Sequence, residues 1–423
     1  MGHEAIDSLS EADRAALERI RGLQAALTAQ TVEWARINTG SWNAAGLKAL
    51  APEIARRFGA LEAEVRLRPL EPFEIVSARG EAEHVETGPL IAVSARQDAP
   101  VQIVMTGHYD TVFPPGTFEN ITEPEPGRLN GPGLTDMKGG LGVMCAALEV
   151  FEAGPLKEKL GYRIAITPDE EIGNPASADA LREAARSGSG AQVGMTYEPA
   201  LEDGGLAGAR KGSGNFSLVI RGRAAHAGRA HHEGRSAILA ASRFIVALEA
   251  LNGQREGVTF NAAKIDGGAP NNQVPDMAVV RFNSRIPDPE AQAWAEAQID
   301  ALVAMVKASD GITAHLHGSF YRPAKPFNVA QQALFEAVRG TGRAIGLDLN
   351  WTPTGGVCEG NNIFAAGVPN VDTLGVRGGA IHSTGEFLLT DSFEERVALS
   401  VLLLNRLADG RVDAAHIKSL MER

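Results

Sequence analysis

The stretch VQIVMTGHYD at residues 101–110 gives the first indication of the fold. An apolar run of the β type ends there in a small and polar turn that carries His108 and Asp110. The same pattern recurs where the runs Tyr162–Ile166, Val193–Thr196 and Val371–Val376 lead to Glu170-Glu171, Glu198 and His382. Ligands of open α/β sheets bind beyond the carboxyl ends of the strands. The sequence therefore predicts an α/β fold with a charged site at one edge of its sheet.

The residues at these positions, together with Asp136, form a set suited to metal ions. Imidazole and carboxylate groups are ligands that zinc accepts, and clustered carboxylates need a cation to hold them together. The adjacent Glu170 and Glu171 would point in different directions, which suits one general base and one ligand. Taken singly, each signal has an ordinary explanation, such as Asp136 capping the helix that follows it. Their shared placement at strand ends predicts a metal-dependent hydrolase.

Composition narrows the class of protein. A chain of 423 residues favours two domains. The net charge of −12 argues against a nucleic-acid partner, and no apolar run approaches the roughly 20 residues that span a bilayer. The acidic, polar segment Met1–Asp13 has no signal-peptide pattern. Two cysteines, Cys145 and Cys358, are too few for a disulfide framework, so we expect a cytoplasmic protein.

The order of expected elements predicts an interrupted domain. Apolar spacing predicts helices over Glu11–Ile37 and Ala44–Gly59, then alternating strands and helices, with a loop over Phe113–Gly133. From residue 211 the order becomes β-α-β-β-α-β, the split ferredoxin-like module. Its expected elements are Asn215–Gly222, Ser236–Leu251, Val258–Ile265, Met277–Ile286, Pro289–Ala308 and Ile312–Gly318. We expect a catalytic domain of residues 1–210 and 322–423, with helices on both faces of a mixed sheet, and an inserted lid or dimerisation domain of residues 211–321.

Several motifs resemble one zinc metallopeptidase family. They are GHYDTV (107–112), GPGLTDMKGG (131–140), DEE (169–171), YEP (197–199), RAAHAG (223–228) and His382. The chain is similar to the family of aminoacylase, glutamate carboxypeptidase, acetylornithine deacetylase and succinyl-diaminopimelate desuccinylase, over almost its whole length from Leu23. RPAKPFN (322–328) and TGG (354–356) also resemble its folate-cleaving glutamate carboxypeptidases.

The resemblance implies a site with two zinc ions. His108 and Glu198 would bind one ion, Glu171 and His382 the other, and Asp136 would bridge them. Asp110 would support His108, and Glu170 would be the general base. Cobalt or manganese could replace zinc in such a carboxylate-rich site.

The resemblance also assigns roles around the substrate. His226 would reach the active site of a neighbouring subunit and stabilise the oxyanion, in a homodimer formed through the inserted domain. Asn272 and Arg285 would bind the substrate, with Arg285 on its free carboxylate. Gly355 and Gly356 would lie near the substrate. From the residues alone, His226 could instead belong to an exposed His-rich loop, and Arg285 could be an ordinary exposed strand arginine.

Two departures from the family pattern bear on function. Met137 stands where relatives often carry a second Asp, and we expect a cis peptide bond between Asp136 and Met137. The loop GGVCEGNN (355–362) replaces the commoner Gly-Gly-Gly-Thr-Asp-Ala, which leaves the substrate open. Cys358 fits a small buried filler better than a nucleophile. We expect hydrolysis of a peptide or N-acyl amino acid beside a free carboxylate, or alternatively a non-catalytic metal-dependent binding protein on the same fold.

Overall fold

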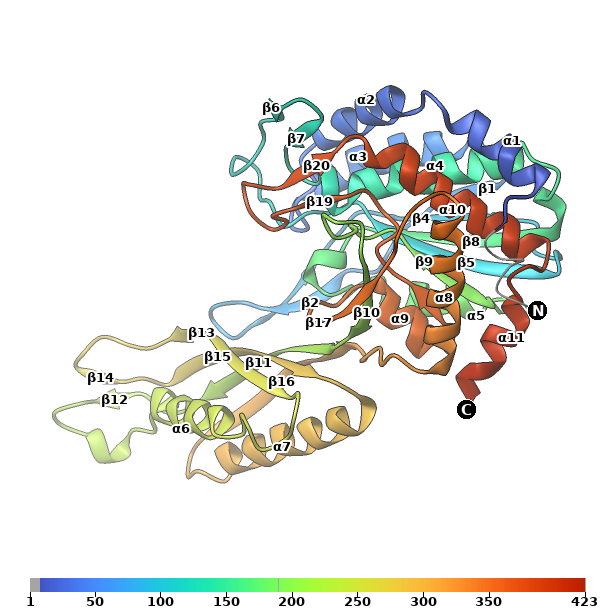
Figure 1. Cartoon of the computed structure of the whole chain (residues 1–423). Helices are drawn as coiled ribbons and strands as arrows, with labels where there is room; N and C mark the ends of the chain where they lie inside the picture. The colour runs from blue at the N-terminus through green and yellow to red at the C-terminus, as the bar shows by residue number, and fades with distance from the viewer. Residues whose placement is uncertain (1–7, 189, 423) are drawn as a thin grey trace.

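The computed structural model describes residues 8–188 and 190–422. Figure 1 shows a large unit that holds both the first and the last described elements of the chain and a smaller, elongated unit beside it. The described residues contain no helix that is long and apolar enough to cross a membrane. Most of the Met1–Asp13 segment, on which the signal-peptide prediction rests, lies outside the described residues.

The large unit is built around a six-stranded mixed sheet. Its spatial order is β1 (Glu64–Arg68), β4 (Leu90–Ala95), β8 (Leu160–Thr167), β5 (Val101–His108), β9 (Val193–Thr196) and β18 (Asn370–Val371). The strands β8, β5, β9 and β18 run parallel, whereas β1 and β4 are antiparallel to their neighbours. Strand β5 is buried along almost its whole length, as a central parallel strand must be. The predicted mixed α/β fold is confirmed.

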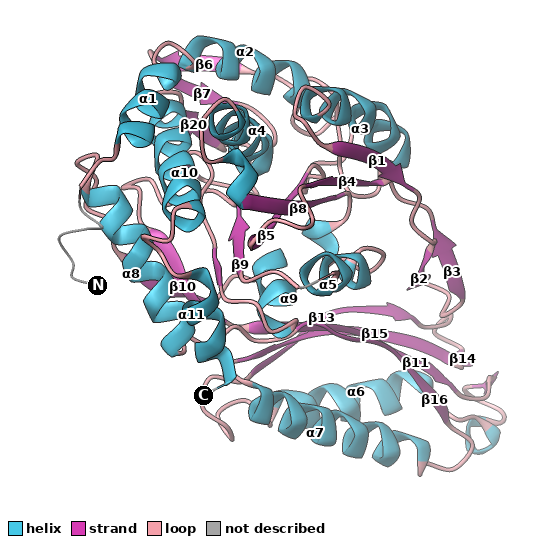
Figure 2. Cartoon of the chain, turned by 90° about the vertical axis from the view of Figure 1, so that its right-hand side faces the viewer, coloured by secondary structure: helices cyan, strands magenta, loops and turns pink. Residues whose placement is uncertain are grey.

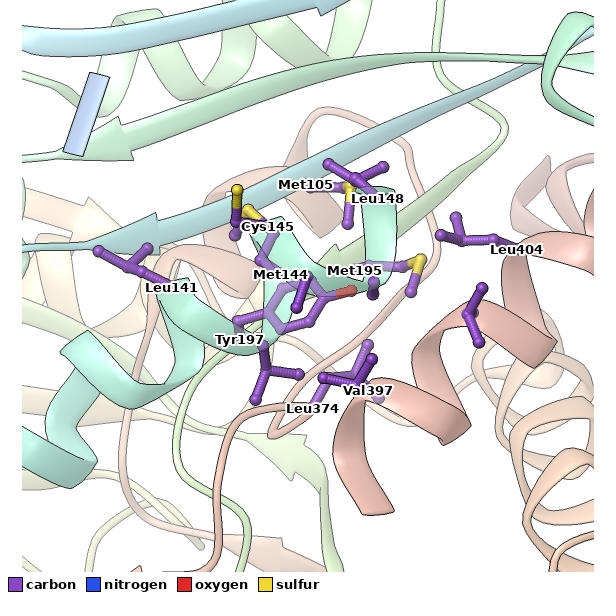
Figure 3. Packing of buried hydrophobic residues seen from close by; sticks show 14 of the residues in the cluster. Met105, Leu141, Met144, Cys145, Leu148, Met195, Tyr197, Leu374, Val397 and Leu404 are labelled. Atoms are coloured by element: carbon purple, nitrogen blue, oxygen red, sulfur yellow. The ribbon is translucent and has the colours of Figure 1, made fainter. Parts of the chain in front are cut away.

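Helices cover both faces of this sheet (Figure 2). They are α1 (Glu11–Ile20), α2 (Gln24–Ala35), α3 (Ala44–Phe58), α4 (Gly139–Glu152), α5 (Ala178–Arg186), α8 (Val329–Arg343), α9 (Glu359–Ala365), α10 (Ser392–Ala408) and α11 (Ala414–Ser419). Figure 3 shows Met144 of α4, Met195 of β9 and Val397 of α10 packed around Tyr197, all buried. This apolar layer lies directly beneath the segment that carries Glu198, and so fixes its position.

Three sequence predictions about this unit need correction. The helix expected over Glu11–Ile37 is two helices, because Gly22 takes a φ of 85°, in the left-handed region that ends a right-handed helix. The loop expected over Phe113–Gly133 contains β6 (Thr122–Glu125) and β7 (Arg128–Asn130). These strands form a small sheet with β19 (Gly378–Gly379) and β20 (Phe387–Leu389). The strand expected over Val371–Val376 pairs only at Asn370–Val371.

The smaller unit has its own sheet and its own hydrophobic core. The sheet order is β13 (Thr259–Gly267), β15 (Met277–Ile286), β11 (Gly212–Arg221) and β16 (Thr313–Arg322), all antiparallel. Helices α6 (Ala237–Glu249) and α7 (Pro289–Lys307) pack on one face of it, as Figure 2 shows. At the far end, β12 (Ala225–His226) pairs with β14 (Gln273–Val274). We propose that this unit is the inserted domain.

The chain enters and leaves the smaller unit at one place. Arg210 ends β10 (Leu206–Arg210), which pairs with β17 (Trp351–Thr354). The backbone NH groups of Arg210 and Lys325 each donate to the other's carbonyl at 2.9 Å. The Asn361 side-chain amide donates to the carbonyls of Lys211 and Pro323, at 2.9 and 2.8 Å. The Asn361 amide therefore binds both segments that connect the two units. Asn361 belongs to the loop of residues 355–362, which departs from the family pattern.

A second connection between the units is a hairpin that the sequence did not predict. It consists of β2 (Phe73–Val76) and β3 (Ala82–Val85). Val76 packs against Val219 and Val279 of the smaller unit, and Arg281 donates to the Val76 carbonyl at 2.7 Å. The hairpin therefore rests on the face of the β11–β15 sheet that the two helices leave open.

Candidate metal centre

Strand ends bring the predicted site residues together. His108 is the last residue of β5 itself, so the strand runs three residues further than the expected Val101–Met105. Glu170 and Glu171 follow β8, and Glu198 follows β9, the strands on either side of β5. Asp136 lies in the segment Leu134–Lys138, which directly precedes α4. Its peptide bond to Met137 is cis. The expected cis geometry at this bond is confirmed.

Asp136 lies between the two histidines. Its Oδ1 is 3.1 Å from His108 Nε2, and its Oδ2 is 3.2 Å from His382 Nε2. His382 Nε2 is also 3.1 Å from Glu171 Oε2, and His108 Nε2 is 3.9 Å from Glu198 Oε1. The two histidines therefore lie on opposite sides of one carboxylate, each beside a further carboxylate.

Asp110 contacts the other ring nitrogen of His108 and the backbone of both glutamates. It is fully buried, and its Oδ1 lies 3.3 Å from His108 Nδ1. Its two oxygens accept hydrogen bonds from the backbone NH groups of Glu170 (3.0 Å) and Glu171 (3.1 Å), and one accepts from the Ser41 hydroxyl at 2.6 Å. A single carboxylate thus orients the imidazole and both glutamates. Ser41 has no motif around it, and the sequence did not predict its role.

The pKa values reflect a surplus of buried negative charge. Burial, and next the charge of Asp136, raise the pKa of Glu171 to about 8. Burial is also the largest cause that raises the pKa of Glu198. It acts in the same direction on Asp136, but hydrogen bonds from His108 and His382 outweigh it and leave the pKa of Asp136 below its usual value. Hydrogen bonds to Asp136 and Glu171 raise the pKa of His382 to about 11.

This donor set fits divalent metal ions. Donor atoms of His108, Asp136 and Glu171 lie within 4.8 Å of one another, and so do those of His108, Glu170 and Glu198. Glu198 Oε1 is buried and has no hydrogen-bond partner within the described structure, although buried carboxylate oxygens need one. A cation beside this oxygen would meet that need and would offset the charge that raises the neighbouring pKa values.

The cluster forms one wall of a cleft of about 530 Å³. Arg285 and Arg322 line the same cleft, as does Gly356, whereas its neighbour Gly355 is not among the lining residues. Arg285 Nη1 is buried and unpartnered among the described residues. Arg322 is the most informative residue that the sequence did not single out as a site residue, because its Nη2 lies 2.8 Å from Glu170 Oε1. The sequence feature that pointed to Arg322 was the family resemblance of the segment RPAKPFN (322–328), which begins at this residue.

His226 and Asn272 lie elsewhere in the chain. His226 is in β12, is exposed, and accepts hydrogen bonds from the NH groups of Gly228 and Arg229 on its Nδ1. The Asn272 carbonyl accepts from Ala227 at 2.8 Å, so Asn272 belongs to the same tip. Arg285 is at the opposite end of β15, a strand that spans about 30 Å at 3.3 Å per residue. Within one chain, the expected substrate-binding pair Asn272 and Arg285 is therefore not brought together.

The fold and the site together define the class. Imidazole and carboxylate donors collected at the carboxyl edge of an α/β sheet, inside a cleft, are the apparatus of a metal-dependent hydrolase. The model of Peptidase family M20/M25/M40 matches residues 104–406, and the chain belongs to this family. The resemblance found in the sequence is confirmed, and the protein is a hydrolase that acts on peptide or other C–N bonds.

Individual relatives span most of the chain. Carboxypeptidase G2 of Pseudomonas sp. (strain RS-16) is 23% identical over 384 residues, which cover 89% of this chain and 88% of the relative. A succinyl-diaminopimelate desuccinylase of Xylella fastidiosa (strain 9a5c) is 27% identical over 348 residues, covering 77% and 89%. The YXEP protein of Bacillus subtilis, a dinuclear metal-binding peptidase of the M20 family, shares the fold with a TM-score of 0.61 at 14% identity. That likeness covers 93% of this chain and 99% of YXEP.

Proposed function

We propose that this protein is a di-zinc hydrolase that cleaves a peptide or N-acyl amide bond beside a free carboxylate. The observation that carries the proposal is the convergence of His108, Glu198, Glu171 and His382 on the two sides of Asp136. His108 and Glu198 would hold one ion, Glu171 and His382 the other, and Asp136 would bridge them. The dinuclear centre named for the B. subtilis relative supports two ions.

Glu170 is the general base in this proposal. Two bound divalent ions would lower the pKa of a water molecule and polarise the scissile carbonyl. Glu170 would take a proton from that water and deliver it to the leaving nitrogen. Its position fits the role, because it is buried at the cleft, Arg322 holds one carboxylate oxygen, and the other lies 3.9 Å from His108 Nε2.

Arg285 would bind the free carboxylate of the substrate. It lines the cleft from the β15 end, and its unpartnered Nη1 is available for a charge-assisted hydrogen bond. A carboxypeptidase substrate and an N-acyl amino acid both present such a carboxylate. The curated relatives include a carboxypeptidase and a desuccinylase, which supports both kinds of substrate.

Hydrolysis of a small panel tests this function. The panel holds folate-like and dipeptide substrates that end in glutamate, together with N-acetyl and N-carbamoyl amino acids. We expect two metal ions per chain, turnover of at least one substrate, and a loss of about 100- to 10,000-fold in kcat for Glu170→Gln. The exposed Glu158→Gln is the matched control. Bound metal without turnover by the wild type would favour a non-catalytic binding protein, and absence of metal binding would contradict the proposal.

We also propose a homodimer in which His226 serves the neighbouring subunit. Its distance from the cluster within one chain supports this, because a second copy could bring another His226 to the cluster. Strand β13 is a sheet edge that exposes Ile265, and α6 exposes Leu239 and Val246 two turns apart on one helical face. A mixed dimer of one His226→Ala chain and one Glu170→Ala chain contains one intact site. Activity should therefore recover to about a quarter of wild type after random mixing of the chains, and to about half for purified mixed dimers. No recovery would contradict the exchange of His226.

A further inference from the structure

A second hollow adjoins the metal cleft. It has a volume of about 540 Å³ and lies between the two units. Trp42, Phe73 and Ile172 of the large unit form one wall, and Phe216 and Tyr321 of the smaller unit form the other. We name this hollow, defined by these five residues, the apolar groove. No residue of the groove belongs to the proposed metal set or to the residues that carry out the reaction.

The groove is continuous with the metal cleft through a short neck. The neck is lined by Arg285 and Arg322, which also line the metal cleft, and by Ile172 and Tyr321, which also line the groove. Ile172 directly follows the proposed ligand Glu171, and consecutive Cα atoms lie about 3.8 Å apart. The groove therefore begins within one residue of the metal site.

The groove suits an uncharged, flat group. The Trp42 side chain is 59% exposed although it is a large apolar group, and its ring lies 6.0 Å from that of the buried Phe73. Aromatic rings favour such offset or tilted partners. The charged side chains at the groove already have partners, since Arg281 pairs with Asp266 and His317 with Glu74. A charged substrate group would find no free counter-charge there.

The groove also has a fixed place relative to the proposed carboxylate site. Arg285 lies at the neck, between the metal cluster and the groove. If Arg285 holds the carboxylate, then the side chain of the residue that bears this carboxylate extends past the neck. The acyl half of the substrate would lie on the other side of the metals. We propose that the apolar groove binds a large aromatic side chain on the carboxylate-bearing residue of the substrate, with Trp42 as its main contact.

This inference rests on the proposed function, so its test includes substrates that do not need the groove. N-acetyl amino acids with phenylalanine, glutamate and alanine side chains are compared in the wild type and in Trp42→Ala. Leu67→Ala, which removes an exposed apolar side chain from β1, is the control. We expect the wild type to prefer phenylalanine, and Trp42→Ala to lower kcat/KM for it about 10- to 50-fold. Turnover of the alanine substrate should stay within about twofold of wild type.

Each outcome has a separate meaning. A wild-type preference for glutamate, an equal effect of Trp42→Ala on all side chains, or an effect that follows the acyl group instead would overturn the groove assignment while leaving the hydrolase intact. If no substrate is turned over, then the proposed function fails. Calorimetric binding of N-acetyl-phenylalanine to the wild type and Trp42→Ala then decides the groove by itself. Equal affinities for the two proteins would refute it.

Discussion

Replacing Arg322 with lysine tests how the proposed general base, Glu170, is held in place. The Arg322 side chain is buried at the end of β16. It pairs with the Glu170 carboxylate, donates to the Glu170 carbonyl, and donates from Nε and Nη2 to Asn174 Oδ1 at 3.2 and 2.8 Å. A lysine keeps the charge but offers a single ammonium group in place of the planar fork. The arginine Nη2 alone contacts all three acceptors, and the lysine chain ends one bond short of that nitrogen, so its ammonium group cannot occupy the same position.

The size of the effect follows from these contacts. A hydrogen bond to a charged group contributes about 1.5–3 kcal/mol, so the loss of one or two of them should lower the free energy of unfolding by roughly 2–4 kcal/mol. Misplacing a catalytic group by about 1 Å can cost about 100-fold in rate. We therefore expect Arg322→Lys to lower kcat about 100-fold and to change KM less than about threefold, because the role proposed for Glu170 is in the reaction and not in substrate binding.

Steady-state kinetics with the best substrate of the panel, together with thermal unfolding and metal content, measure this. Arg182→Lys is the control, because Arg182 makes a surface ion pair with Asp179. Wild-type kcat in Arg322→Lys would refute the positioning role. A rise in KM alone would instead assign Arg322 to substrate binding. Its position at the neck beside the metal cleft is compatible with that alternative role.

Three further predictions concern stability and metal binding. Burial would raise the pKa of Asp372, but Lys325 and Arg210 outweigh it and lower the pKa. The ionised Asp372 carboxylate therefore stabilises the folded protein fully above the unfolded pKa of about 3.9, and this stabilisation is lost as the pH falls through the folded pKa. In denaturant titrations Asp372→Asn should cost about 3–5 kcal/mol at pH 7 and less near pH 3, whereas the exposed Asp300→Asn should cost little. Asp110→Asn should weaken metal binding about 10- to 100-fold in competition with a chelator, and unchanged affinity would remove its supporting role. Chelation should lower the melting temperature of the wild type but not of Asp136→Asn, and equal shifts would contradict a bridging carboxylate.

Much of the fold could be predicted because its strands are buried apolar runs with clear ends. The predicted bounds of β9 and β15 coincide with those observed. The hairpin β2–β3 was missed because its strands are short and β3 is largely exposed, so it has no apolar run. The sheet of the smaller unit was expected from its element order, which contains enough local information to define it.

The candidate site divides in the same way. His108 and Glu198 could be found because the chain places them at strand ends, and the sheet then brings those ends together. Arg322 could not be linked to Glu170, because they meet across 152 positions of the sequence. The distance between Asn272 and Arg285, by contrast, follows from the predicted strand Met277–Ile286, which lies almost entirely between them. Local patterns thus give the donors of the site but not the residues that orient them.

The pairing of β9 with β18 has a consequence for how the protein is made. The smaller unit has all of its strands and its core once Ala324 has been synthesised. The large unit still lacks β18 and α10, which packs against α1 and α4. At about 5–20 residues per second, the ribosome needs roughly 4–17 s more to finish α10. The smaller unit can therefore fold first, beside an incomplete large unit that exposes the apolar faces of α4 and β9. The proposed metal centre can form only after His382 has emerged.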